Sequence, residues 1–195
     1  MQLEKYLQDK NIRLIKTAID SLNHLKAVDS FAVIFTETFL KHPDAGVRRA
    51  TLRAVVTLIA LIPEEKRPQY TTNIYLVLDA DTDVETRVLA ARTLGSISDQ
   101  NSRDFLSGAA GAQDASIARE IIDALLAHKS PLSVKALENS ADHKSSEVRA
   151  YLYKRLIELK ASKLGAAARS ILQYSLKRES NEKLKSQVSS ALQSW

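Results

Sequence analysis

One short pattern of residues occurs six times along the chain, and this repetition constrains the fold more than any other feature. The stretch DAGVRRATLRAVVTL, which starts at Asp44, aligns with DVETRVLAARTLGSI, which starts at Asp83. The same frame fits four further segments, more loosely at the two ends of the chain. The first apolar or β-branched position of each frame, here called the anchor, is Leu14, Val47, Thr86, Ile117, Val148 or Leu184. The anchors are on average 34 residues apart, a period typical of repeat proteins whose similar units stack on one another.

Each frame has the features of an amphipathic helix. Three residues before the anchor stands Asn, Asp or Ser, whose side chain can accept a hydrogen bond from an amide of the first helical turn. Apolar or small residues mostly occupy positions 0, 4, 7, 8 and 11 counted from the anchor, and at about 100° per residue they share one stripe. Positions 2, 6 and 9 lie opposite this stripe. We therefore predict that each frame begins a helix with one buried face.

The segments between the frames are also apolar-periodic and are bounded by Pro, Gly, Asp or Ser, so they are predicted to be partner helices. The chain has only 5 Gly and 4 Pro, and good helix formers dominate it. No helix of such a hairpin can bury its stripe alone, so neighbouring hairpins must share a core. We predict about twelve helices, no strands and a single domain over residues 1–195. The partner helices are expected at residues 28–42, 68–80, 102–111, 131–141 and 164–179.

The frames at Asp44 and Asp83 resemble the second helices of HEAT repeats, close to the short variety also seen in bilin-lyase-like proteins. The resemblance covers nearly the whole chain. It implies an all-α fold, a right-handed α–α superhelix that forms a HEAT-like solenoid of about six helical hairpins. It also implies that the Asp of each frame and the Arg just after the anchor link adjacent repeats in a hydrogen-bonded ladder. That Arg is present as Arg48, Arg87 and Arg149, becomes Lys185, and is lost at Ile15 and Ala118.

Few residues of the sequence are suited to catalysis or metal binding. There is no Cys, which excludes a disulfide framework, a thiolate metal site and a Cys nucleophile. The four His residues are scattered, without the adjacent His-Glu pairs that di-iron hydroxylases of this fold use. The only Trp is Trp195, and at most one of Tyr151 and Tyr153 faces the interior, unlike the aromatic cleft of HEAT-like alkylpurine glycosylases. We predict no enzyme activity, no catalytic residue, no cofactor and no metal.

The distribution of charge and hydropathy leaves binding as the expected role. No apolar run approaches the roughly 18 residues that span a bilayer, so a soluble, cytoplasmic protein without membrane contact is expected. The net charge of +5 is uneven, because residues 131–195 hold 12 Lys and Arg against 6 Asp and Glu, whereas residues 1–130 hold 16 against 17. This basic third could attract an acidic partner or nucleic acid, although a solvated surface is the simpler explanation.

The expected binding surface is the concave side of the solenoid, which the second helices line in the HEAT family. Positions 2 and 6 would place a discontinuous basic stripe there, interrupted by Asp20 and Asp123. Its candidate residues for partner binding are Lys16, Arg49, Arg53, Arg92, Arg119 and Lys154.

Three hypotheses for function remain open at the level of sequence. The favoured one is a non-enzymatic scaffold or adaptor that binds a protein or peptide on the concave face. The alternative is a nucleic-acid-binding solenoid that uses the basic groove. A third is an enzyme subunit such as a lyase-like chaperone for a pigment. The interrupted stripe, and the lack of groove aromatics to stack on bases, favour the first. The polar outer face of the last helix suggests a capping unit and hence a monomer.

Overall fold

A computed structural model describes residues 2–27, 37–97, 99–111 and 114–195. Over these ranges the chain contains α-helices, short 3-10 helices and turns, and no strand. The all-α fold class predicted from the repeat pattern is therefore confirmed. Within the same ranges, no helix is both long and apolar enough to cross a membrane.

The chain divides into two compact units, residues 1–102 and residues 103–195. A single domain over residues 1–195 stays a prediction.

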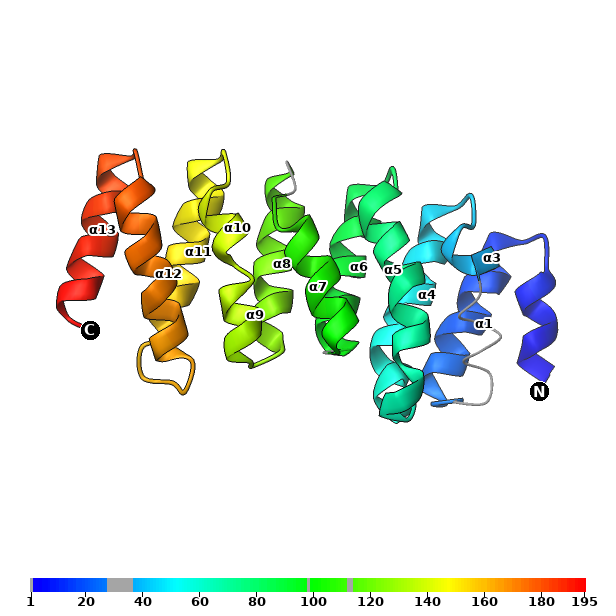
Figure 1. Cartoon of the computed structure of the whole chain (residues 1–195). Coiled ribbons are helices and arrows are strands. Elements are labelled where there is room, and N and C mark those ends of the chain that lie inside the picture. Colours follow the sequence, from blue (N-terminus) through cyan, green and yellow to red (C-terminus); the bar gives the residue numbers. More distant parts are fainter. Residues whose placement is uncertain (1, 28–36, 98, 112–113) are drawn as a thin grey trace. The chain divides into compact units, whose positions relative to one another are not determined.

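The first unit is built from helices packed in two layers (Figure 1). Helix α4 packs against α1 on one side and α6 on the other, and α3 and α5 contact each other and cover α4 and α6. We call α1, α4 and α6 the second-helix layer of this unit, and α3 and α5 its first-helix layer. Its elements are η1 (Gln2–Gln8), α1 (Ile12–His24), α3 (Glu37–Leu40), α4 (Ala45–Leu58), η3 (Ile59–Leu61), η4 (Glu64–Lys66), α5 (Pro68–Ala80) and α6 (Val84–Ile97).

The second unit repeats this arrangement. Helix α11 packs against α8 and α13, which together form the second-helix layer, while α9 and α10 pack against α12 in the first-helix layer. Helix α7 (Gln100–Ala109) contains the boundary between the units. The remaining elements are α8 (Ala115–Ala127), α9 (Pro131–Lys135), α10 (Glu138–Ala141), α11 (Ser146–Glu158), α12 (Gly165–Arg178) and α13 (Glu182–Gln193).

The predicted partner helices are mostly confirmed, with one correction. Residues 68–80 form α5, but the helix expected over 131–141 is divided into α9 and α10. At the division the amide of Leu137 donates to the carbonyl of Val134, three residues back, which interrupts the α-helical hydrogen-bond pattern. Of the helix expected over 28–42, only Glu37–Leu40 is helical within the described residues, and residues 28–36 lie outside them.

The capping residues explain where the second helices begin. Asp44 accepts from the amide of Val47 at 3.0 Å, and Asp83 accepts from that of Thr86 at 2.9 Å. Asn11, Asp114 and Asn181 make equivalent bonds. Five of the six predicted caps are thus confirmed. Ser145 is the exception, because its side chain makes no capping hydrogen bond although its backbone has the extended conformation of a cap.

The predicted buried stripe is confirmed in α4 and α6, where positions 0, 4, 7, 8 and 11 are all buried. In α1 the prediction is wrong at the anchor, since Leu14 is 39% exposed and Ile15 only 5%, whereas Ala18 and Leu22 at positions 4 and 8 are buried as predicted. The apolar spacing of Ile15, Ala18, Ile19 and Leu22 fixes the buried face of this helix.

Candidate functional site

All six residues of the predicted basic stripe lie on second helices. Lys16 is on α1, Arg49 and Arg53 are on α4, and Arg92 is on α6, all in the first unit. Arg119 on α8 and Lys154 on α11 belong to the second unit. The structure therefore brings together four of the candidates in one unit and two in the other. A single stripe along the whole chain stays a prediction.

Four of the six side chains are exposed, namely those of Arg53, Arg92, Arg119 and Lys154. Arg119 also donates from Nε to the carbonyl of Ala115 in its own helix, at 3.1 Å. These four residues are on the surface of the second-helix layers, where a partner could reach them.

The other two candidates are half-buried and take part in packing between helices. Arg49 lies 3.0 Å from Asp83 and 2.6 Å from Glu85, so its guanidinium is neutralised by the start of α6. Lys16 lies against the start of α4, because a Cβ built on Gly46 would stand 3.1 Å from its ammonium nitrogen. The sequence pattern placed both residues on the exposed side. Their contacts show that they join neighbouring repeats.

The acidic interruption at Asp123 is itself part of a network that the sequence analysis missed. The hydroxyl of Tyr151 donates to Asp123 at 2.5 Å, and Nε of Arg155 lies 2.9 Å from its other oxygen. Arg155 also donates to Glu158 at 2.8 Å. Burial and the bond to Asp123 raise the pKa of Tyr151 to about 12, so it remains a hydrogen-bond donor at neutral pH. Position 7 of the frame, where Arg155 stands, had been assigned to the buried stripe, which is why this cation was overlooked.

The expected ladder between repeats is present, but with a different acidic partner. Arg48 on α4 binds the carboxylate of Asp81 through two nitrogens, at 2.6 and 2.7 Å, and also donates to the carbonyls of His42 and Pro43. Asp81 stands two residues before the capping Asp83 and accepts its amide at 2.8 Å. The capping Asp83 had been the expected partner of the ladder Arg, and that prediction is wrong, because Asp83 pairs with Arg49.

The second unit contains the same arrangement of an Arg bound to a carboxylate two residues before the next cap. Arg149 on α11 binds Glu179 through two nitrogens, both at 2.8 Å, and donates to the carbonyls of His143 and Lys144. Glu179 stands two residues before the capping Asn181, accepts its amide, and also accepts from the buried hydroxyl of Tyr153 at 2.8 Å. The bond described for the third ladder candidate, Arg87, goes to the carbonyl of Leu78 within its own hairpin.

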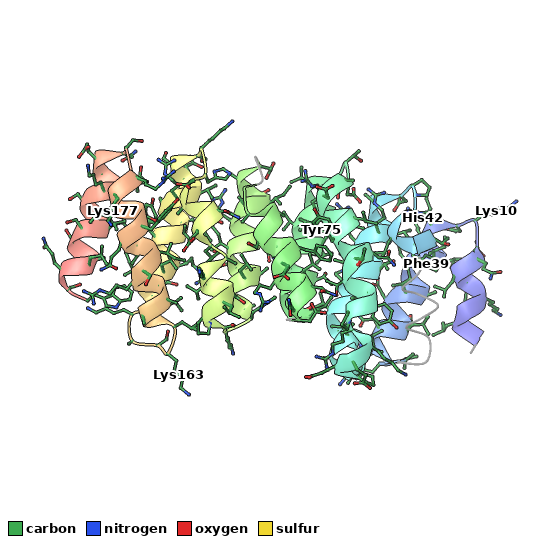
Figure 2. All side chains as sticks on the ribbon, viewed as in Figure 1. Lys10, Phe39, His42, Tyr75, Lys163 and Lys177 are labelled. Carbon is green, nitrogen blue, oxygen red and sulfur yellow. The ribbon has the colours of Figure 1, made fainter. Side chains whose placement is uncertain are left out.

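Histidines occupy the equivalent position before two other caps. Nδ1 of His42 accepts from the amide of Asp44, and Nδ1 of His143 accepts from that of Ser145, both at 3.0 Å. Figure 2 labels His42 at the turn before α4. These two residues therefore have a structural part, as acceptors that order the turn.

The buried carboxylate of Glu179 gives the stability of the chain a defined dependence on pH. Hydrogen bonds from Arg149 lower the pKa of Glu179 from its ordinary 4.5 to about 2, although burial acts in the opposite direction. A carboxyl whose pKa is lower in the folded state stabilises the fold above its ordinary pKa and loses that contribution as the pH falls. We expect the difference in thermal midpoint between the wild type and Glu179→Gln to narrow from pH 5 to pH 2. A difference that stays constant over this range would contradict the assignment.

Comparison with known proteins agrees with this repeated arrangement of helices and junctions. Residues 73–156 match the family described as HEAT repeats. The matched range runs from α5 to α11 and contains the frames of Thr86, Ile117 and Val148. A search of the curated proteins gave no match.

Solved structures show a similar fold over nearly the whole chain, beyond the range that the family model matches. An engineered protein is similar with a TM-score of 0.54 and 18% identity, over 98% of this chain and 94% of that one. A designed armadillo repeat protein gives 0.53 and 14%, over 98% of both chains. The complex of CpcE and CpcF of phycocyanin lyase from Nostoc sp. PCC7120 gives 0.54 and 15%, over 98% and 92%. At these identities the likeness establishes a HEAT-like or armadillo-like solenoid fold.

Proposed function

We propose that this chain is a non-enzymatic scaffold or adaptor that holds a peptide or helix of a partner protein against its second-helix layers. These layers are expected to form the concave side of the solenoid. Stacked helical repeats offer extended surfaces of this kind, on which peptides and helices can dock. The proposal includes a monomeric chain in the cytoplasm. The exposed residues of α13 include Ser186, Gln187, Ser190 and Gln193, all polar, and this supports a monomer.

The mixed charge of the second-helix layers is the observation that supports a protein partner over a nucleic acid. Phosphate binding requires several cations that can neutralise phosphates together. Arg49 already pairs with two carboxylates of the chain, and the half-buried Asp123 places a carboxylate, paired with Arg155, in the second-helix layer of the second unit. Such a patterned face suits a partner that presents both charges and apolar side chains, because complementary charges then set register and specificity.

A display selection of random peptides against the full chain tests this proposal. Enriched peptides should bind the wild type and lose affinity by at least about tenfold for Arg53→Glu, Arg92→Glu in the first unit or Arg119→Glu, Lys154→Glu in the second. The matched control is Lys135→Glu, Lys177→Glu, which makes the same change in charge at exposed residues of the first-helix layer. Peptides whose affinity depends only on the control pair would contradict the proposed face.

Nucleic acid is tested in the same assay with mixed-sequence single- and double-stranded DNA and RNA. We expect no micromolar binding near physiological salt. Micromolar binding that Arg53→Glu, Arg92→Glu abolishes, and whose logarithm falls linearly with the logarithm of salt concentration, would replace the scaffold proposal by the nucleic-acid alternative.

A further inference from the structure

A pocket of about 560 Å³ opens in the second-helix layer of the second unit. It lies where the C-terminal ends of α8 and α11 meet the loop that leads into α12. Its apolar lining comes from Leu126, Ala127, Leu159 and Leu164. This volume is within the range of about 300–1,000 Å³ that is usual for binding pockets. None of the six residues of the predicted stripe lines it.

The carboxylates that line this pocket form ion pairs within the chain, and its two lysines differ from them in this respect. The carboxylates of Asp123 and Glu158 are both occupied by Arg155, and Asp123 also accepts from Tyr151. The two remaining charged residues of the lining are Lys129 and Lys163, both exposed, and no ion pair is described for either within this unit. Figure 2 shows Lys163 on the loop between α11 and α12, where its side chain extends away from the helices. Two exposed lysines therefore line the pocket together with its apolar residues.

The second unit as a whole is positively charged, like the two lysines of the pocket. Residues 103–195 contain 15 Lys and Arg against 10 Asp and Glu, so this unit carries a net charge of +5. A field of this sign attracts an acidic segment and raises its association rate, while an apolar side chain buried in a pocket supplies most of the affinity. This pocket combines positive charge with an apolar lining.

We propose that the pocket receives a bulky apolar side chain from an acidic peptide segment of a partner protein, whose flanking carboxylates pair with Lys129 and Lys163. The inference deepens the proposed scaffold function and rests on it. It adds the place of docking and the chemistry of the segment that docks there. An apolar floor contributes nothing to the binding of a phosphate backbone, so the pocket favours a peptide over nucleic acid.

The test uses an acetylated, amidated octapeptide in which Leu and Phe at the centre are flanked on each side by three Asp or Glu residues. Titrated into the full ¹⁵N-labelled chain, it should shift the backbone amides of residues 123–129 and 155–164 with millimolar or tighter affinity. Ala127→Phe, which fills the pocket without changing its charge, should weaken binding at least about tenfold. Lys129→Glu, Lys163→Glu should weaken it by a similar factor.

Two matched controls separate charge from position. Lys135→Glu, Lys177→Glu changes the net charge by the same amount at residues that do not line the pocket, and it should leave the affinity within about twofold. An octapeptide with Ser in place of Leu and Phe should bind at least about tenfold more weakly. Equal weakening by both Lys pairs, or equal binding of the Ser peptide, would overturn the pocket assignment.

The remaining outcomes distinguish this inference from the function on which it rests. If the octapeptide shifts no amide near the pocket while display-selected peptides still bind the second-helix layers, the pocket assignment is wrong and the scaffold function stands. If a twelve-residue oligothymidylate shifts the same amides with equal affinity, the site binds phosphates and the peptide assignment is wrong.

Discussion

Arg149→Met is expected to lower the free energy of unfolding by about 3–5 kcal/mol, because it leaves a carboxylate buried without its cation. The side chain of Glu179 is 0% exposed and that of Arg149 13%. Arg149 supplies two of the hydrogen bonds to this carboxylate. Denaturant unfolding followed by circular dichroism at pH 7 measures the effect.

Two further variants show whether the loss comes from the buried charge. In Arg149→Met, Glu179→Met neither charge remains, so the double variant should be more stable than Arg149→Met alone. Arg178→Met removes the cation of an exposed pair, since Arg178 and Asp142 are 59% and 43% exposed, and it should change stability little. Similar losses for Arg149→Met and Arg178→Met would show that burial of the pair has no energetic importance.

Gly165→Ala is expected to destabilise the chain by about 1–3 kcal/mol through overpacking. A Cβ on Gly165 would stand 2.6 Å from the carbonyl oxygen of Lys160 and 3.2 Å from that of Leu159. Both atoms belong to the backbone, so neither can turn away as the end of a side chain could. The start of α12 would have to move relative to the end of α11. A lower thermal midpoint would measure this cost.

Gly108 provides the matched control for this substitution. It lies in α7, and nothing stands within 4 Å of the place that its Cβ would occupy. Gly108→Ala should therefore stabilise the chain by about 0.5 kcal/mol, because Ala favours a helix more than Gly does. If both substitutions changed stability in the same direction, close packing would not be the reason for glycine at position 165.

Local features of the sequence were sufficient to predict most of the fold. Spacing and capping chemistry predicted where α4 and α6 begin and which face each buries, since both are decided within a few residues. The same reasoning failed at Leu14, because the buried face of α1 consists of Ile15, Ala18, Ile19 and Leu22. It also failed for residues 131–141, where the amide of Leu137 bonds to the carbonyl of Val134, three residues before it, and the predicted helix is divided into two.

The candidate site depended on contacts that no local pattern contains. Arg49 was predicted to be an exposed cation, but its partners Asp83 and Glu85 belong to the next repeat. The sequence does not predict the role of Arg155, because its frame position holds a small residue in the other well-aligned repeats, namely Ala54, Thr93 and Ala124. Its partner Asp123 also comes from a neighbouring repeat. The contacts between stacked repeats decide which cations remain unpaired. A prediction from helix position alone therefore overestimated the number of cations in the basic stripe.

The junctions between repeats have a consequence for how such a chain can be rearranged. Where the residue after the anchor is Arg48 or Arg149, the next repeat offers Asp81 or Glu179 before its cap. Where that residue is Ile15 or Ala118, the next repeat offers His42 or His143 instead. A shuffled chain that joined an Arg repeat to a His repeat would set a guanidinium against an imidazole and leave it without a carboxylate. At these four junctions the residue after the anchor is matched by the residue two positions before the next cap, so exchanging the repeats that they join would break this match.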